Sequence, residues 1–77
     1  MMETDHFLDA SGLTCPMPLL KAKQKLNQIA VGETLRVIGT DPGSMRDFAS
    51  FIKLTSHEML ECVEEDRVYR YVIRKGS

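Results

Sequence analysis

The chain has 77 residues, a formal net charge of −1 and 43% hydrophobic residues, so we expect one domain over residues 1–77 with a single core. A domain this small excludes a large internal substrate cavity, so its chemistry is expected at the surface, on a group that another protein supplies or removes. The near-neutral charge argues against general binding of nucleic acid, because polyanion binders carry a concentrated basic excess.

Residues 1–6 lack the basic start and apolar run of a secretory signal, and no stretch approaches the roughly 20 apolar residues that span a bilayer. These features predict a cytoplasmic protein with no direct membrane contact. Cys15 and Cys62 lie far apart in sequence and have no metal-ligand spacing with the two histidines. We therefore expect two free thiols, no metal and no cofactor.

The first half of the chain predicts a strand, a helix and a second strand. Residues 6–9 form a short strand that ends before a turn at Gly12. A helix is expected over residues 16–30, because apolar side chains recur there at helical spacing, and Gly32 ends it. Residues 34–40 form the second strand. The apolar face of the helix consists of Leu19, Ala22, Leu26 and Ile29.

The second half predicts another helix and a hairpin. The helix spans residues 42–54, and strands are expected over residues 58–63 and 67–74, joined by a tight acidic turn at residues 64–66. The inner positions are Met45, Phe48, Ala49 and Ile52 in the helix and Tyr69, Tyr71 and Ile73 in the last strand.

This order, βαβαββ, predicts an α/β (α+β) fold. Because strand–helix–strand crossovers are right-handed, both helices fall on one face of a four-stranded mixed sheet and form a two-layer sandwich. The other face of the sheet is expected to be partly exposed. Arg36, Arg70 and Arg74 are expected on that face, where we favour ordinary solvated residues.

The segment Cys15-Pro16-Met17-Pro18 is the strongest candidate site. Pro16 fits the first helical position, and a residue before proline favours extended backbone, so Cys15 is expected to be the N-cap. The helix dipole and the remaining amide donors, those of Met17 and Leu19, predict a moderately lowered pKa of Cys15. The alternative is a small buried cysteine, which the flanking turn residues disfavour.

Acidic side chains are expected near this thiol. Asp9 ends the first strand and Asp41 follows the second, so both are expected at the same edge as Cys15. A carboxylate beside a thiolate raises the thiol pKa, and helix capping is the favoured role for Asp41. Ser44 and Asp47 resemble a capping box one turn into the second helix.

The remaining candidates have mainly structural interpretations. Cys62 lies in a strand and is expected in the core rather than as a resolving thiol. Met17 and Met45 form an apolar rim near the thiol or fill the core, and core filling is favoured for Met45. His6 and His57 are expected to be solvated.

Several motifs together resemble the TusA (SirA-like) family of sulfur carriers over nearly the whole chain. They are Leu8-Asp9 through Gly12-Leu13, Cys15-Pro16-Met17-Pro18, Asp41-Pro42, and Tyr69-Arg70-Tyr71-Val72-Ile73-Arg74-Lys75. The resemblance implies a two-layer α/β sandwich and a cytoplasmic protein that carries sulfane sulfur as a persulfide on Cys15. It also implies that Pro16 and Pro18 shape the loop and that Asp41 is the family's acidic position, and it gives Cys62 no role.

The resemblance implies partners as well. They are a sulfur donor, such as a cysteine desulfurase or a rhodanese, and an acceptor protein, so the chain would act in a sulfurtransferase relay rather than as a stand-alone enzyme. The family's settings are tRNA 2-thiolation, molybdenum-cofactor maturation and sulfur oxidation. A monomer is expected, because the thiol must face two partners in turn. Lys21, Lys23 and Lys25 are expected to steer an acidic partner or simply to be solvated.

Two other functions stay open at this point. A thiol oxidoreductase needs a second cysteine within reach of Cys15, and Cys62 is the sole candidate. A non-catalytic regulatory or nucleic-acid-binding module would tolerate the loss of Cys15, but the near-neutral charge argues against it.

Overall fold

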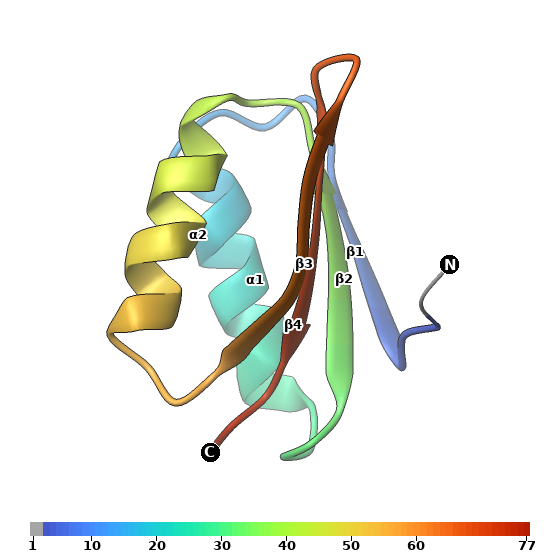
Figure 1. Ribbon diagram of the computed structural model, residues 1–77, viewed down its shortest axis with the longest axis vertical. Helices are drawn as coiled ribbons and strands as arrows, with labels where there is room; N and C mark the ends of the chain where they lie inside the picture. Colours follow the sequence, from blue (N-terminus) through green and yellow to red (C-terminus); the bar gives the residue numbers. More distant parts are fainter. Residues whose placement is uncertain (1–2) are drawn as a thin grey trace.

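The computed structural model describes residues 3–77, so the prediction for the amino terminus lies outside the described residues where it concerns residues 1 and 2. The element order is βαβαββ, as the sequence predicts (Figure 1). The elements are β1 (His6–Ala10), α1 (Met17–Gln28), β2 (Thr34–Gly39), α2 (Gly43–Lys53), β3 (Glu58–Glu65) and β4 (Val68–Arg74).

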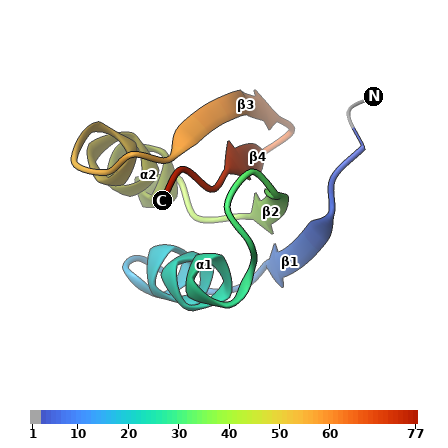
Figure 2. The ribbon, with the colours of Figure 1, turned by 90° about the horizontal axis from the view of Figure 1, so that it is seen from below.

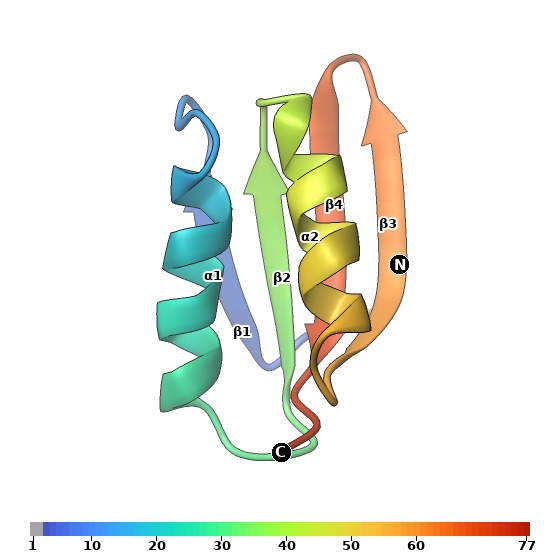
Figure 3. The ribbon, with the colours of Figure 1, turned by 90° about the vertical axis from the view of Figure 1, so that its left-hand side faces the viewer.

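The four strands form one mixed sheet in the order β1-β2-β4-β3. β1 and β2 are parallel, and the other two neighbouring pairs are antiparallel. Both helices cover the same face of the sheet, where they lie side by side (Figures 2 and 3). The predicted two-layer sandwich is therefore confirmed, and the connections that follow β1 and β2 lie at the same end of the molecule (Figure 1).

The core lies between the sheet and the two helices. Burying each large apolar side chain contributes roughly 1.5–3 kcal/mol relative to leaving it exposed. Phe48 of α2 stacks on Tyr71 of β4 with the ring centroids 4.3 Å apart, which joins the second helix to the centre of the sheet. The predicted inner positions are largely confirmed, but Ala49 is exposed, because it lies about 100° around the helix from Phe48. The fully buried apolar side chains include Ala22, Leu26, Leu35, Val37, Phe48, Tyr71 and Ile73.

The opposite face of the sheet carries the predicted arginines. Their places follow from the strand register, which pairs Arg36 with Val72, Ile38 with Arg70 and Thr34 with Arg74. Arg70 forms an ion pair with Glu65, and Arg74 pairs with Glu58. These pairs neutralise positive charge on this face with acidic residues of β3.

The hairpin turn differs from its prediction. β3 continues to Glu65, and Glu64 and Glu65 pair with residues of β4. The turn consists of Asp66 and Arg67, whose φ angles are 51° and 64°. A two-residue loop with positive φ at both central positions matches the twist of antiparallel strands, which explains why the turn is shorter than the acidic run suggested.

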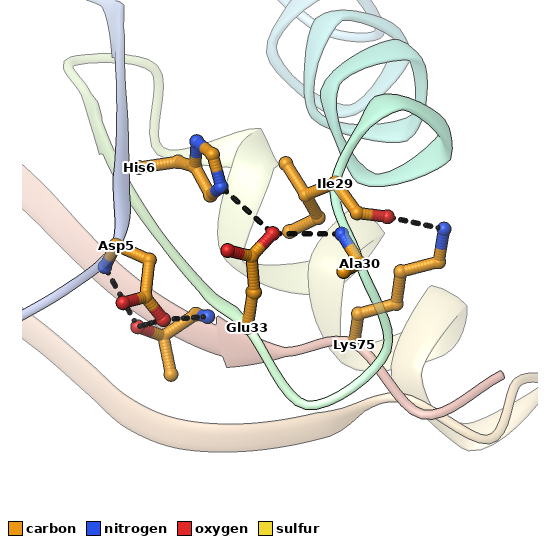
Figure 4. A network of polar contacts seen from close by, with 7 residues as sticks. Asp5, His6, Ile29, Ala30, Glu33 and Lys75 are labelled. Atoms are coloured by element: carbon orange, nitrogen blue, oxygen red, sulfur yellow. Dashed lines mark hydrogen bonds and ion pairs between the residues drawn. The ribbon is translucent and has the colours of Figure 1, made fainter.

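The end of the sheet where β1 and β2 begin is closed by polar contacts (Figure 4). Glu33 lies at its centre, with Oε1 3.0 Å from Nε2 of His6 and accepting the backbone N–H of Ala30 at 2.7 Å. Lys75 donates to the carbonyl of Ile29 at 2.8 Å. These contacts join the end of α1, the start of β2 and the carboxyl-terminal segment.

Within residues 3–77, neither helix has the length and apolar character needed to cross a membrane.

Candidate functional site

The loop that carries Cys15 connects β1 to α1 and is tied to the end of β2. Gly12 has a φ of 80°, a backbone conformation that favours glycine, and its N–H donates to Oγ1 of Thr40 at 2.9 Å. The N–H of Leu13 donates to the carbonyl of Ala10 at 3.2 Å. The loop therefore turns sharply after β1 and holds to the neighbouring parallel strand.

Cys15 is not the N-cap of α1. The helix begins at Met17, its N-cap is Pro16, and no side chain caps it. The N–H of Met17 donates to the carbonyl of Thr14 at 2.8 Å, so this amide closes a turn before the helix instead of donating a hydrogen bond to the Cys15 sulfur. The peptide bond between Cys15 and Pro16 is cis, and Pro18 is buried in the first turn. The predicted capping geometry was therefore one residue out of place.

Asp41 holds the Cys15 loop from the other side. Its Oδ2 accepts the backbone N–H of Cys15 at 3.0 Å, a contact between residues 26 apart in sequence. The N-cap of α2 is Pro42, with no side-chain cap, so the predicted capping role of the Asp41 carboxylate was wrong. The carbonyl of Asp41 instead accepts both the N–H of Ser44, at 3.1 Å, and its hydroxyl, at 2.7 Å.

The start of α2 packs closely against Cys15. A Cβ atom on Gly43 would lie 3.1 Å from Oδ2 of Asp41 and 3.5 Å from Cβ of Cys15, so the missing side chain allows the close approach. Ser44 is buried, and its hydroxyl lies 2.7 Å from the hydroxyl of Tyr71 in β4. This hydrogen bond fixes the first turn of α2 on the sheet.

The thiol of Cys15 donates a hydrogen bond to Oδ2 of Asp47. Asp47 therefore faces the sulfur and does not form the predicted capping box with Ser44. Sequence reasoning missed this role. No local pattern signalled it, since the contact joins residues 32 apart in sequence.

The surroundings of Cys15 raise the pKa of its thiol above the ordinary value. The hydrogen bond to Asp47 is the main cause, followed by desolvation and by the negative charges of Asp47 and Asp41, whereas Arg46 acts in the opposite direction. The predicted lowering of the pKa was wrong, because Cys15 is not the N-cap, and the Asp47 hydrogen bond, desolvation and the two negative charges all favour the neutral thiol.

The other predicted residues take mainly structural places. Asp9 accepts the N–H of Ser11 at 3.0 Å, and its hydrogen bonds to Ser11 lower the pKa of Asp9. Met17 is 39% exposed, whereas Met45 packs against the core as favoured. Cys62 is exposed, so its predicted core position was wrong; it lies on β3, at the edge of the sheet.

The two histidines are partly buried. His6 contacts Glu33, and Nδ1 of His57 accepts the N–H of Gly76 at 3.0 Å. The prediction that both are simply solvated was therefore wrong, since each takes part in a contact between distant segments.

A surface hollow of about 370 Å³ lies between the helices and reaches Asp47. Exposed Leu54 and half-buried Phe51 contribute apolar surface, and Nζ of Lys23 lies 5.4 Å from the centre of the Phe51 ring. The residues that line the hollow are Leu19, Lys23, Asp47, Ser50, Phe51, Leu54 and Thr55.

Comparison with known proteins identifies the family. Residues 6–75 match the family described as Sulfurtransferase TusA. Sulfur carrier protein TusA of Allochromatium vinosum is 48% identical over 76 residues, which are 99% of this chain and all of that protein. YrkF of Bacillus subtilis is 41% identical over 77 residues, which are all of this chain and 42% of that protein.

The fold also matches a solved structure. The crystal structure of a SirA-like protein from Desulfitobacterium hafniense superposes with a TM-score of 0.80 and covers 94% of this chain and 99% of that one. Its sequence identity is 24%, so this likeness concerns the fold alone. The family match and the whole-chain identity support a sulfur carrier role with a donor and an acceptor, and they show that the chain belongs to the TusA family.

Proposed function

We propose that the protein carries sulfane sulfur as a persulfide on Cys15, receives it from a cysteine desulfurase or a rhodanese, and passes it to an acceptor protein. The observation that carries this proposal is the exposed thiol of Cys15 in a loop that contacts Thr40, Asp41 and Asp47, which lie at the end of β2 and the start of α2. A held and exposed sulfur meets a partner without first ordering a loop, which lowers the entropic cost of the encounter.

The chemistry of the relay fits one exposed thiol. A sulfur carrier needs a sulfur that attacks a sulfur–sulfur bond as a thiolate and later leaves as a thiolate. Pro16 and Pro18 restrict the backbone beside this sulfur, and Met17 contributes exposed apolar surface next to it. Cys15 and Cys62 are both free thiols in the described chain, in the β1–α1 loop and on β3 at the edge of the sheet respectively.

We place this carrier in the cytoplasm as a monomer formed by one domain over residues 1–77. Transfer to two partners in turn requires that the loop around Cys15 stay uncovered between encounters. The exposure of Cys15 and Met17 supports such an arrangement.

Intact mass spectrometry tests the proposal. The protein is incubated with a cysteine desulfurase and cysteine, and separately with a rhodanese and thiosulfate. We expect a reducible gain of one sulfur, about 32 Da, in the unmodified chain and in Cys62→Ser but none in Cys15→Ser. A gain that survives Cys15→Ser, or no gain with either donor, would overturn the assignment.

A further inference from the structure

Two carboxylates place the Cys15 sulfur against α2. Asp41 accepts the backbone N–H of Cys15 at 3.0 Å, and Asp47 accepts a hydrogen bond from the Cys15 thiol. Gly43 lies beside them, and a Cβ atom there would be 3.9 Å from the sulfur. The sulfur is therefore directed by a segment 26 to 32 residues away in sequence, in addition to its own loop.

The charged groups that act on this sulfur come from the α2 side. Asp41 and Asp47 favour the protonated thiol, and Arg46 favours the thiolate. Asp47 has the strongest effect, because it accepts the hydrogen bond of the thiol and also contributes a negative charge. A hydrogen bond from the neutral thiol to a carboxylate is lost when the thiol ionises, and the two negative charges then repel.

We propose that Asp47 is a positioning residue for sulfur loading, which keeps the Cys15 sulfur protonated and directed against α2 in the free carrier. This inference rests on the proposed persulfide role of Cys15. It assigns to Asp47 control over how much of the carrier is reactive at a given pH and over how strongly the resulting thiolate attacks.

The loading step shows where this control acts. The thiol of Cys15 gives up its proton, and its sulfur attacks the outer sulfur of the donor's persulfide. A sulfur–sulfur bond forms on Cys15 while the donor's sulfur–sulfur bond breaks, and the leaving donor sulfur takes the bonding electron pair and a proton. The sulfane sulfur moves without net oxidation. Asp47 acts on the first event of this step, because it opposes release of the thiol proton.

The test is the rate of Cys15 alkylation by iodoacetamide across the pH range, measured in a Cys62→Ser background with and without Asp47→Asn. Loss of the carboxylate is expected to lower the apparent pKa of Cys15 by about one unit. The thiolate fraction at neutral pH then rises about tenfold, but nucleophilicity falls about threefold as the pKa falls. Alkylation should therefore be about threefold faster at neutral pH and about threefold slower above both pKa values.

Three variants separate this role from a structural one. Asp47→Glu keeps a carboxylate and should stay closer to the parent profile, and Asp47→Ala should repeat the crossover of Asp47→Asn while retaining good helix propensity. Glu3→Gln makes the same charge change at an exposed residue before β1 and should leave the profile unchanged. Alkylation profiles of the same shape in the parent and in Asp47→Asn would overturn the proposal, because they would show no effect on ionisation. Faster alkylation of Asp47→Asn at every pH would also overturn it, because that would show only a loss of shielding.

Iodoacetamide needs no sulfur donor, so this outcome is independent of the loading assay. If neither donor adds sulfur to Cys15, the persulfide role fails, and the alkylation profile still decides whether Asp47 controls the ionisation of the thiol.

Discussion

The two ends of the parallel β1–β2 pair use carboxylates differently. Where the strands begin, Glu33 contacts His6 and the amide of Ala30, and these contacts lower the pKa of Glu33, with the Ala30 hydrogen bond as the main cause. Where the strands end, Asp47 accepts a hydrogen bond from the thiol of Cys15 and raises the pKa of that thiol. One carboxylate is itself stabilised in its charged form, whereas the other opposes the charging of a neighbour. At the first end, Glu33 joins distant segments of the fold. At the second end, Asp47 shifts the ionisation of a neighbouring thiol.

The anchor of α2 at the thiol end gives the largest expected effect on stability. Ser44→Ala leaves the buried hydroxyl of Tyr71 without its partner, so the free energy of unfolding should fall by about 1–3 kcal/mol in a urea titration. Tyr71→Phe should cost less, because the Ser44 hydroxyl keeps the carbonyl of Asp41 as an acceptor. A larger loss for Tyr71→Phe than for Ser44→Ala would contradict this account of the anchor.

The contacts of Glu33, where β1 and β2 begin, should affect the stability of the protein but not the rate of sulfur loading. Glu33→Ala removes the acceptor for the Ala30 amide and the contact to His6, so we expect the Tm to fall by a few degrees. The rate at which Cys15 gains sulfur should stay unchanged, and Glu3→Ala serves as the control for charge. Slower loading in Glu33→Ala would break the separation between the two ends.

The close approach at Gly43 should affect loading more than stability. In Gly43→Ala the added Cβ would lie 3.1 Å from Oδ2 of Asp41 and displace the carboxylate that holds the Cys15 backbone, so we expect several-fold slower loading in the mass assay. The free energy of unfolding should change by less than about 1 kcal/mol, because the better helix propensity of alanine offsets part of the strain. Gly39→Ala is the matched control, since a Cβ there meets no atom within 4 Å. Unchanged loading in Gly43→Ala would show that the Cys15 loop adjusts freely.

The smallest expected effect is the pH dependence that Glu33 contributes. Its folded pKa is lowered, so its stabilisation is present above the ordinary glutamate pKa of about 4.3 and is lost as the pH falls through the lower folded pKa. Between about pH 5 and about pH 3, the free energy of unfolding of Glu33→Gln should therefore fall less than that of the unmodified chain. Urea midpoints at the two pH values measure this, and identical losses in both proteins would argue against the contribution.

Periodicity explains why much of the fold is predictable from sequence. The alternation of Tyr69, Tyr71 and Ile73 predicted the buried face of β4, and the helical spacing of Ala22 and Leu26 predicted the buried face of α1. The same local patterns did not locate the hairpin turn, because Arg67 has a positive φ although arginine is not among the residue types that mark such turns.

The candidate site shows a similar division. Its central residue, Cys15, was predicted from the prolines beside it and from the motifs of the TusA family. The exposure of Cys62 was not predicted, because it depends on the placement of β3 at the edge of the sheet, which the order of strands in space decides.

By itself, the sequence determined the order of the elements and most of their inner faces, and it singled out Cys15 as the candidate thiol, since each of these depends on residues close together in the chain. The sequence also predicted Asp41 at the same edge as Cys15, but the tertiary structure alone decided which atoms of Asp41 and Asp47 contact this residue. Asp41 and Asp47 lie 26 and 32 residues from Cys15, and they reach it because the parallel pairing of β1 and β2 places the two following segments at one end of the sheet. The electrostatics of the sulfur therefore follow from strand pairing, a long-range property that local sequence patterns do not contain.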